Sequence, residues 1–271
     1  MYKYGLTLGI FNMINISEIN IINNSAAGCF KLTVGVFSDE FSKKITGKSP
    51  VVNFESRIEI VKSLKAVSSA VCIDSISDIE CYAKNTDYCL FANKKNTYFK
   101  DEIKFASTEY ISDIFTEPNA DEVYNPNMHK NQIVGYTTGV YDLFHIGHLN
   151  LLKRAKEKCD YLIVGVSTDE VVKQYKNKIP VMNYKERSDI IRNIKYADKV
   201  VVQDNMDKFS AWTELKYNVI FHGDDWKGSP MYSEIEKKLN DVGVKIVYFP
   251  YTKGISSSIL IKKISDNNGG Q

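Results

Sequence analysis

Apolar and polar positions alternate in two different rhythms along the second half of the chain. Residues 149–159 and 184–194 carry leucine and isoleucine at helical spacing, and a last helix is predicted after 254–258. Four stretches are instead short apolar or β-branched runs of strand length, at 132–138, 161–167, 218–223 and 245–250. Asn183, followed three positions later by Glu186, predicts a capping box at the start of the second helix. Strands that alternate with helices predict a parallel sheet with helices on both faces, whose ligands bind beyond the carboxyl ends of the strands.

The first half of the chain resembles the second half. A shift of 130 residues aligns 5–74 with 135–204 without a gap, and 22 of these 70 positions are identical. An ungapped match of this length indicates an internal duplication. The clearest matches are LTVGVFSDE with LIVGVSTDE (32–40 and 162–170) and GKSPVVNFESR with NKIPVMNYKER (47–57 and 177–187).

The repeat predicts two domains and a linker. We expect a first domain over 1–115, a linker over 116–131 and a second domain over 132–271, because the stretch between the copies is rich in proline and asparagine and has no apolar period. The first copy shows no clear counterpart of the strand at 245–250. We therefore expect it to be a trimmed version of the same fold.

Composition excludes several broad classes of function. Apolar residues make up 44% of the chain and charged residues 25%, which is typical of a globular protein, and no apolar run is long enough to span a membrane. A formal net charge of +2 argues against general nucleic-acid binding. The first residues resemble a strand rather than a signal peptide, so we expect a cytoplasmic protein. The cysteines show no metal-binding or CxxC spacing, which is typical of scattered free thiols: Cys29, Cys72, Cys81, Cys89 and Cys159.

The strongest chemical signal is GVYDLFHIGH at 139–148. It follows a predicted strand and opens a helix, where free backbone N–H groups and the positive helix end favour a phosphate chain. His145 and His148 lie three residues apart, so both imidazoles face one side and can donate hydrogen bonds to phosphate oxygens as charge develops. Gly147 allows close approach to the backbone. We expect no zinc site, because no third ligand of a suitable type lies nearby.

These residues resemble the HxGH cytidylyltransferases, the family of glycerol-3-phosphate, phosphocholine and phosphoethanolamine cytidylyltransferases. The resemblance covers about 132–265. It includes five segments in the family's order: GVYDLFHIGH (139–148), VGVSTDE (164–170), KNKIPVMNYKER (176–187), HGDDW (222–226) and TKGISSS (252–258). It implies a Rossmann-like nucleotide-binding fold in each copy. It also implies a Mg²⁺-assisted transfer of CMP from CTP to a phosphorylated alcohol, which releases pyrophosphate without a covalent enzyme intermediate and is catalysed by positioning and charge stabilisation.

The same resemblance assigns the site residues. His145 and His148 match the pair that stabilises the α-phosphate, and Lys176 and Lys178 match the lysine loop that neutralises substrate phosphates. Arg187 matches an arginine of the same segment, although the first copy keeps Arg57 there, which favours a structural ion pair equally. The remaining predicted nucleotide contacts come from the three loops: Thr138, Gly139, Val140, Tyr141, Asp142, Gly147, Gly223, Asp224, Asp225, Tyr251, Thr252, Gly254, Ile255, Ser256, Ser257 and Ser258.

Three of these segments also have plain structural interpretations. A lysine pair such as Lys176 and Lys178 is commonly a solvated loop, and two aspartates after a strand are commonly a turn. Serines at a helix start are commonly caps, although such a terminus also binds anions. Among the aspartates, Asp225 is the first candidate for a ribose or cytosine contact and Asp224 the second.

The chain departs from the family pattern at Tyr251. The family has an arginine there that holds the triphosphate, and Lys253 is the nearest replacement. The first copy departs further: Asn15 and Glu18 replace the two histidines, and Thr46 replaces Lys176. Glu18 would repel a triphosphate. We therefore expect the first copy to be inactive.

Several functions are compatible with these motifs. Our first hypothesis is a cytidylyltransferase whose acceptor is glycerol 3-phosphate, followed by phosphoethanolamine or phosphocholine. An adenylyltransferase of the same fold is the alternative enzyme, and a silent nucleotide-binding or scaffold protein is the alternative of another class. A class I aminoacyl-tRNA synthetase is excluded because the chain is short and has no KMSKS-like loop.

The repeat also predicts a partner within the chain. Related enzymes pair two identical domains around a two-fold axis, and the linker of about 17 residues has a reach of roughly 20–25 Å. We therefore expect the two copies to pair intramolecularly as a pseudo-dimer. The other expected partners are CTP and the phosphorylated alcohol, with no nucleic acid and no membrane insertion.

Overall fold

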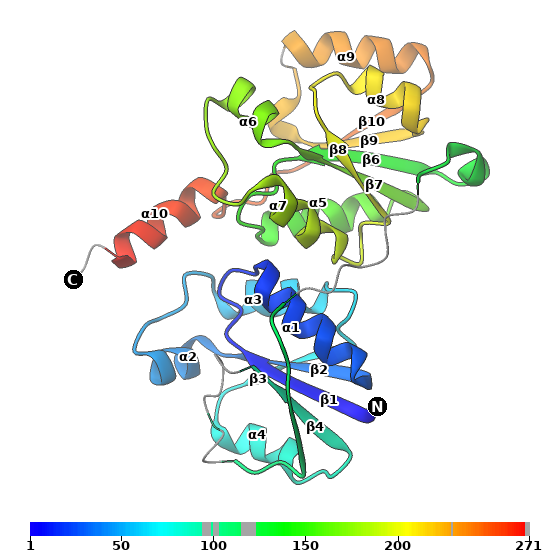
Figure 1. The fold of residues 1–271 in the computed structure, drawn as a ribbon. Coiled ribbons are helices and arrows are strands. Elements are labelled where there is room, and N and C mark those ends of the chain that lie inside the picture. The colour runs from blue at the N-terminus through cyan, green and yellow to red at the C-terminus, as the bar shows by residue number, and fades with distance from the viewer. Residues whose placement is uncertain (94–98, 100–102, 115–122, 229, 269–271) are drawn as a thin grey trace. The chain divides into compact units, whose positions relative to one another are not determined.

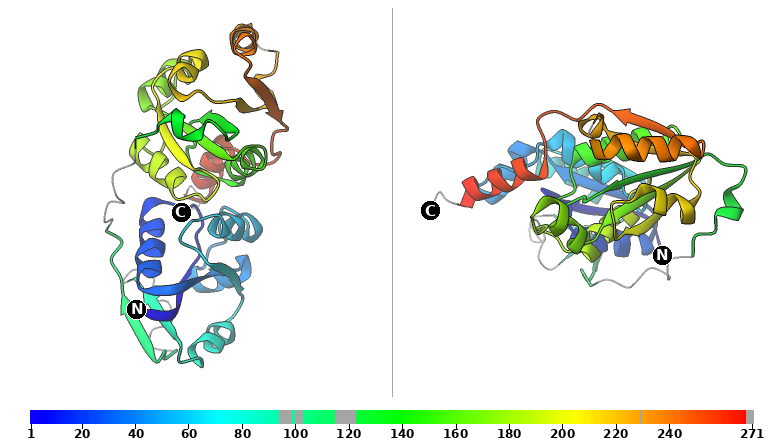
Figure 2. Two further views of the ribbon diagram at one scale, coloured as in Figure 1. Left: turned by 90° about the vertical axis from the view of Figure 1, so that its right-hand side faces the viewer. Right: turned by 90° about the horizontal axis from the view of Figure 1, so that it is seen from above.

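The computed structural model describes residues 1–93, 99, 103–114, 123–228 and 230–268. Two compact units make up the chain, one of residues 1–117 with 258–271 and one of residues 118–257. Each unit contains a parallel five-stranded sheet flanked by helices on both faces (Figure 1 and Figure 2). This confirms the α/β class with two tandem Rossmann-like units. None of the helices in the described part combines the length and hydropathy of a bilayer span.

The first unit has the strand order β3-β2-β1-β4-β5. Helices α1 and α3 cover one face and α2 and α4 the other (Figure 1). Its elements are β1 (Tyr2–Gly9), α1 (Ile16–Ala27), β2 (Cys29–Phe37), α2 (Asp39–Thr46), α3 (Phe54–Lys62), β3 (Ser69–Ile73), α4 (Ile76–Ala83), β4 (Tyr88–Ala92) and β5 (Ser107–Tyr110).

The second unit has the equivalent order β10-β9-β6-β7-β8. Helices α5 and α7 lie on one face of the sheet, and α6, α8 and α9 on the other (Figure 1). Its elements are η1 (Pro126–His129), β6 (Val134–Gly139), α5 (Ile146–Lys156), β7 (Tyr161–Ser167), α6 (Asp169–Lys176), α7 (Tyr184–Arg192), β8 (Lys199–Gln203), α8 (Lys208–Leu215), β9 (Val219–Gly223), η2 (Asp224–Trp226), α9 (Pro230–Asp241) and β10 (Lys245–Phe249), and α10 (Ser257–Asn268) follows.

Strand register is the same in the two sheets over their first four strands. Gly5 pairs with Leu32 in the first sheet, as Gly135 pairs with Leu162 in the second. The 130-residue shift also relates the pairs of β1 with β4 to those of β6 with β9. The fifth strand breaks the pattern, because Cys89 pairs 18 residues ahead and Val219 pairs 26 residues ahead. The second unit has η2 and α9 in this longer connection.

Two sequence predictions need correction here. The first unit does have a fifth strand, β5, whose sequence STEY is largely exposed and therefore carries no apolar run. The predicted linker is also partly ordered. Residues 115–122 lie outside the described part, but Tyr124 donates a hydrogen bond to the Leu215 carbonyl, and the His129 ring stacks near Tyr161 in the second unit.

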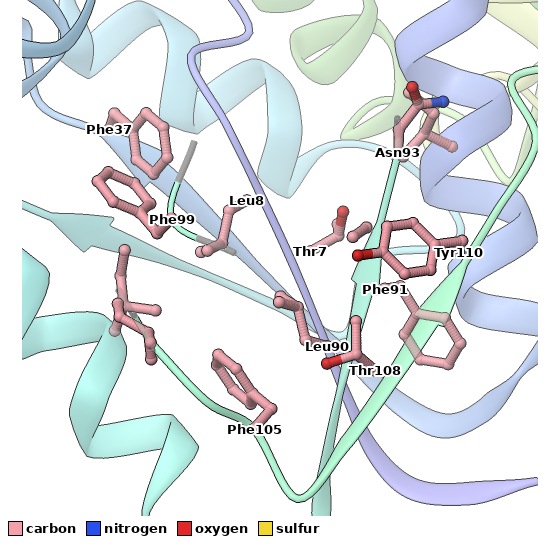
Figure 3. A pocket seen from close by; sticks show the side chains of 14 residues that line it. Thr7, Leu8, Phe37, Leu90, Phe91, Asn93, Phe99, Phe105, Thr108 and Tyr110 are labelled. Carbon is pink, nitrogen blue, oxygen red and sulfur yellow. The ribbon is translucent and has the colours of Figure 1, made fainter. Parts of the chain in front are cut away.

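A mainly apolar cavity of about 110 Å³ lies in the first unit where β1 and β4 separate (Figure 3). Phe37, Leu90 and Phe105 line it together with Thr108 and Tyr110. None of the described side chains in its wall is a lysine, arginine or histidine. The described part of this wall therefore offers no cationic group to a triphosphate.

Candidate active site in the second unit

The loop after β6 presents the two predicted histidines. His145 is the N-cap residue of α5, and its Nδ1 accepts a hydrogen bond from the Gly147 backbone N–H at 3.1 Å. Because Nδ1 accepts, a neutral His145 carries its proton on Nε2 and can donate from there. The His145 and His148 rings stack with centroids 3.8 Å apart.

Both histidines are neutral in this environment. Burial lowers the pKa of His145 to about 4. Burial also holds the pKa of His148 well below its ordinary value, and repulsion from the protonated form of His145 and from the Lys176 ammonium lowers it further. The site therefore offers imidazole N–H donors at neutral pH without adding a buried positive charge.

Packing within the loop favours glycine at position 147, independently of any approach by a ligand. A Cβ at this position would lie 2.9 Å from His145 Cε1. The glycine therefore allows the His145 ring to fold back over the helix start and cap it. The backbone of this loop is also strained at two positions. Tyr141 and Leu143 both have positive φ angles, which are unusual for residues other than glycine.

The lysine loop is tied to the histidine loop by Asp142. Its carboxylate accepts hydrogen bonds from the backbone N–H groups of Val181 and Met182 at 2.9 and 3.0 Å. Burial lowers the pKa of Lys176, which lies at the end of α6, while the charges of Asp225 and Asp142 oppose this shift and that of Lys178 adds to it. Asp142 therefore holds the lysine loop in place with both of its carboxylate oxygens.

Arg187 lies in a structural network rather than at the surface of the site. It is fully buried and donates to the carbonyl oxygens of Met182 and Val140 and to the Asp169 carboxylate. Arg57 makes the equivalent contacts in the first unit, with Val52, Ile10 and Asp39 as its partners. This shared geometry favours the ion-pair interpretation of Arg187.

The HGDD segment contributes two different aspartates. Asp224 accepts a hydrogen bond from the Tyr251 backbone N–H at 3.1 Å, so it joins β9 to the last loop. The Asp225 carboxylate folds over Gly223, where a Cβ would lie 2.5 Å from its Oδ1. Of these two aspartates, Asp225 is the one whose charge acts on Lys176 and raises the pKa of that lysine.

The last loop closes the site from the other side. Ser257 donates to the Asp142 carbonyl at 2.7 Å, and Ile255 lies beside Gly147. Thr252 accepts a hydrogen bond from Asn150 of α5, and Gly254 has a positive φ of 82°. Tyr251 does not replace the expected arginine, because its hydroxyl donates to the Ile255 carbonyl within the same loop.

The structure thus brings four predicted segments together at the carboxyl edge of the second sheet. These are the loop at 138–148, the lysine loop at 176–182, the segment at 223–225 and the loop at 251–257. Ser256 belongs to the last of these loops, and Ser258 lies in α10. The described residues contain no group of three or more histidine, cysteine or acidic side chains that could hold a metal ion.

The equivalent edge of the first unit keeps the helix cap and the loop contacts of the second unit but has neither of the two histidines. Asn15 caps α1 as His145 caps α5, but it accepts from the Glu18 N–H and has no second ring nitrogen. Asn12 accepts from the N–H groups of Val51 and Val52, as Asp142 does from its two amides. Burial raises the pKa of Glu18 to about 7.

An HxGH loop between the first strand of a parallel α/β sheet and its helix defines a nucleotidyltransferase-like domain. Comparison with known proteins gives the family. The Cytidylyltransferase-like family model matches residues 136–263. The chain belongs to this family, whose named members are enzymes.

The similarity to curated proteins lies in about half of the chain. Glycerol-3-phosphate cytidylyltransferase of Bacillus subtilis is 35% identical over 136 residues, which are 48% of this chain and 95% of that protein. Ethanolamine-phosphate cytidylyltransferase of Dictyostelium discoideum is 34% identical over 147 residues, 51% of this chain and 39% of that protein. FAD synthase of Thermococcus sibiricus is 32% identical over 125 residues, 45% and 83% of the two chains.

Proposed function

We propose that the second unit transfers CMP from CTP to a small phosphorylated alcohol, with glycerol 3-phosphate as the first candidate acceptor. The observation that carries the proposal is the stacked pair of neutral histidines, in which His145 uses Nδ1 to cap α5 and leaves Nε2–H for a ligand. The resemblance to glycerol-3-phosphate cytidylyltransferase over nearly that whole protein supports the choice of acceptor.

The reaction needs positioning and charge stabilisation rather than a nucleophile on the protein. An acceptor phosphate oxygen forms a bond to the α-phosphorus of CTP, the bond to the β-phosphate oxygen breaks, and pyrophosphate leaves. His145 and His148 donate to the oxygens of the pentacoordinate α-phosphate, and Lys176 and Lys178 neutralise the phosphates. Magnesium enters as part of the substrate, MgCTP, since triphosphate oxygens are its preferred ligands and the described residues offer no protein cage.

A pyrophosphate-release screen tests this function. CTP and ATP are each combined with glycerol 3-phosphate, phosphoethanolamine, phosphocholine and FMN. We expect release with CTP and a phosphorylated alcohol. Release in the ATP reactions and not in the CTP reactions would favour the adenylyltransferase alternative, which the similarity to FAD synthase supports. No release with any pair, together with CTP binding, would favour a silent nucleotide-binding protein.

We also propose that the first unit arose by duplication and serves as an inactive partner of the second within a pseudo-dimer. The shared register over four strands and the repeated Arg57 and Arg187 networks support the duplication. A structural partner must keep its apolar core and has no use for catalytic histidines. The loss of donors at Asn15 and Glu18 agrees with that role.

A further inference from the structure

The crevice between β1 and β4 of the first unit corresponds to the crevice between β6 and β9 of the second. The strand order reverses at this point in both sheets, and such a point is where open α/β sheets bind ligands. The 130-residue shift relates the two pairs of strands residue by residue. The side chains at equivalent positions of the two crevices can therefore be compared directly.

The outer strands beside the two crevices end in residues of different polarity. In the second unit, β7 ends at Ser167 and β8 at Gln203, and these two buried side chains hydrogen bond to each other at 2.9 Å. In the first unit the equivalent residues are Phe37 and Ile73, which pair in the same register and are fully buried. An apolar contact therefore stands where the second unit has a buried polar one.

The central strands beside the two crevices differ in the same direction. Leu8 of β1 stands at the position of Thr138, and Ala92 of β4 stands at the position of His222. Leu8 and Ala92 both line the cavity of the first unit. A crevice with apolar side chains at these positions favours an apolar ligand, because a strongly polar group buried there would find few hydrogen-bond partners.

The apolar side chains do not fill the crevice. A cavity of about 110 Å³ remains, although protein interiors are close-packed and an empty space of this kind lowers stability. In another protein, an apolar cavity of roughly 150 Å³ lined by leucine, isoleucine and phenylalanine binds benzene. The space in the first unit is therefore of the order that one small ring occupies.

One side of the cavity is a wall of aromatic rings. Phe37 and Phe99 lie edge to face with their centroids 6.0 Å apart, and Phe41 stacks on Phe99 at 5.7 Å. Phe105 lies on the same side of the cavity as Phe37 and Phe99 (Figure 3). These rings hold one another in place, so they present an apolar surface against which a further ring can stack or pack edge-on.

The other side of the cavity carries hydroxyl groups. Thr7 of β1 lies there with Thr108 and Tyr110 of β5 (Figure 3). In the second unit the equivalent Thr137 donates a hydrogen bond to the Phe221 carbonyl at 3.0 Å, whereas Thr7 makes no such bond to the described residues. None of the described residues in the wall is charged. This side therefore offers hydrogen bonds to a neutral polar group.

We propose that the first unit binds a small uncharged molecule that combines one apolar ring with a hydroxyl or carbonyl group. The ring packs against the aromatic wall, and the polar group hydrogen bonds to the Thr7 hydroxyl. This site goes beyond the proposed transfer of CMP, because it makes the first unit a ligand-binding module as well as a structural partner. Phenol is the simplest probe of this class.

NMR titrations of the full chain with phenol test the site. We expect saturable binding at one site, and we expect benzoate, benzylamine and glycerol to bind at least about tenfold more weakly than phenol. Benzoate and benzylamine would each bury a charge that no described residue of the wall pairs, and glycerol has no ring to pack against the phenylalanines.

Two variants locate the binding. Ala92→Leu should weaken phenol binding about tenfold or more and should unfold at a higher urea concentration than the wild type, because its side chain fills the cavity. The same substitution at the exposed Ala27 of α1 is the matched control and should leave phenol binding unchanged. Thr7→Val should weaken phenol binding about fivefold, because a hydrogen bond is lost, and should leave the binding of toluene unchanged.

The outcomes are decisive without any assay of CMP transfer, so a failure of the proposed function leaves this inference standing. Absence of phenol binding to the wild type would overturn it. Undiminished binding to a folded Ala92→Leu variant, or benzoate binding as tight as that of phenol, would also overturn it. If Ala92→Leu does not fold, Thr7→Val decides alone, because equal effects on phenol and toluene would refute the site.

Discussion

His145 has two roles that one substitution can separate. Its Nδ1 caps α5, and its Nε2–H is the proposed donor to the α-phosphate. The first unit indicates which substitution separates them. Asn15 caps α1 at the equivalent position with its side-chain oxygen, and it has no imidazole ring. His145→Asn should therefore keep the cap and remove the imidazole Nε2–H that is the proposed donor to the α-phosphate. His145→Ala should remove both.

The magnitudes of the two effects differ enough to be measured. Loss of an N-cap side chain costs roughly 1 kcal/mol of stability, so the alanine variant should unfold more easily than the asparagine variant by about that amount. Loss of one donor to a developing phosphate charge costs about 2.7–4 kcal/mol, or a factor of about 10²–10³ in kcat. Both variants should lose that factor, whereas their stabilities should differ.

The assays are urea denaturation of each variant and pyrophosphate release at saturating CTP and acceptor. Asn15→Ala in the first unit is the matched control, and it should cost a similar amount of stability while kcat stays within a few-fold. A kcat for His145→Asn within about threefold of the wild type would refute the assignment of Nε2–H as a catalytic donor. Equal stabilities of the two His145 variants would refute the capping argument.

Three further predictions follow from the same structure. The double variant Lys176→Ala and Lys178→Ala should raise the KM for CTP and lower kcat, whereas Lys48→Ala, at the position of the first unit that the 130-residue shift relates to Lys178, should do neither. Unchanged CTP kinetics of the double variant would mean that the two lysines belong to a solvated loop. Folding lowers the pKa of His145 from about 6.5 to about 4, so at this group the unfolded chain binds more protons between these values, and the group's contribution to the unfolding free energy should fall by about 1.4 kcal/mol for each unit by which the pH decreases. Urea titrations of the wild type and of His145→Asn at pH 7 and pH 5 isolate this group, and a wild-type loss of stability no larger than that of the variant would contradict the prediction. The isolated fragment 132–271 should be unstable or self-associate in light scattering if the first copy is its partner, and a monodisperse, fully active monomer would count against the pseudo-dimer.

Local sequence was enough to predict the elements of the site. The period of apolar residues placed β6, β7, β9 and β10, and the Asn183 capping box forms as predicted at the start of α7. The HxGH motif located the loop where His145 and His148 stack. These features depend on residues that are close together in the sequence, so they can be predicted from the sequence alone. The fifth strand of the first unit was missed, because an exposed strand that pairs with one neighbour has no apolar run to show.

Tertiary contacts decided which polar residues are available to a ligand. Arg187 and Asp142 both belong to predicted binding segments, but Arg187 donates to two distant backbone carbonyls and to the Asp169 carboxylate, and each Asp142 carboxylate oxygen accepts a hydrogen bond from a backbone N–H of the lysine loop. Lys208 appears from its sequence to be an ordinary lysine in the first turn of a helix, and only the fold buries it beside His222. Burial and partner choice depend on segments far apart in the chain. For that reason the sequence predicted which segments meet at the carboxyl edge of the second sheet, and the packing of the second unit determined which of their polar side chains already have partners within the protein.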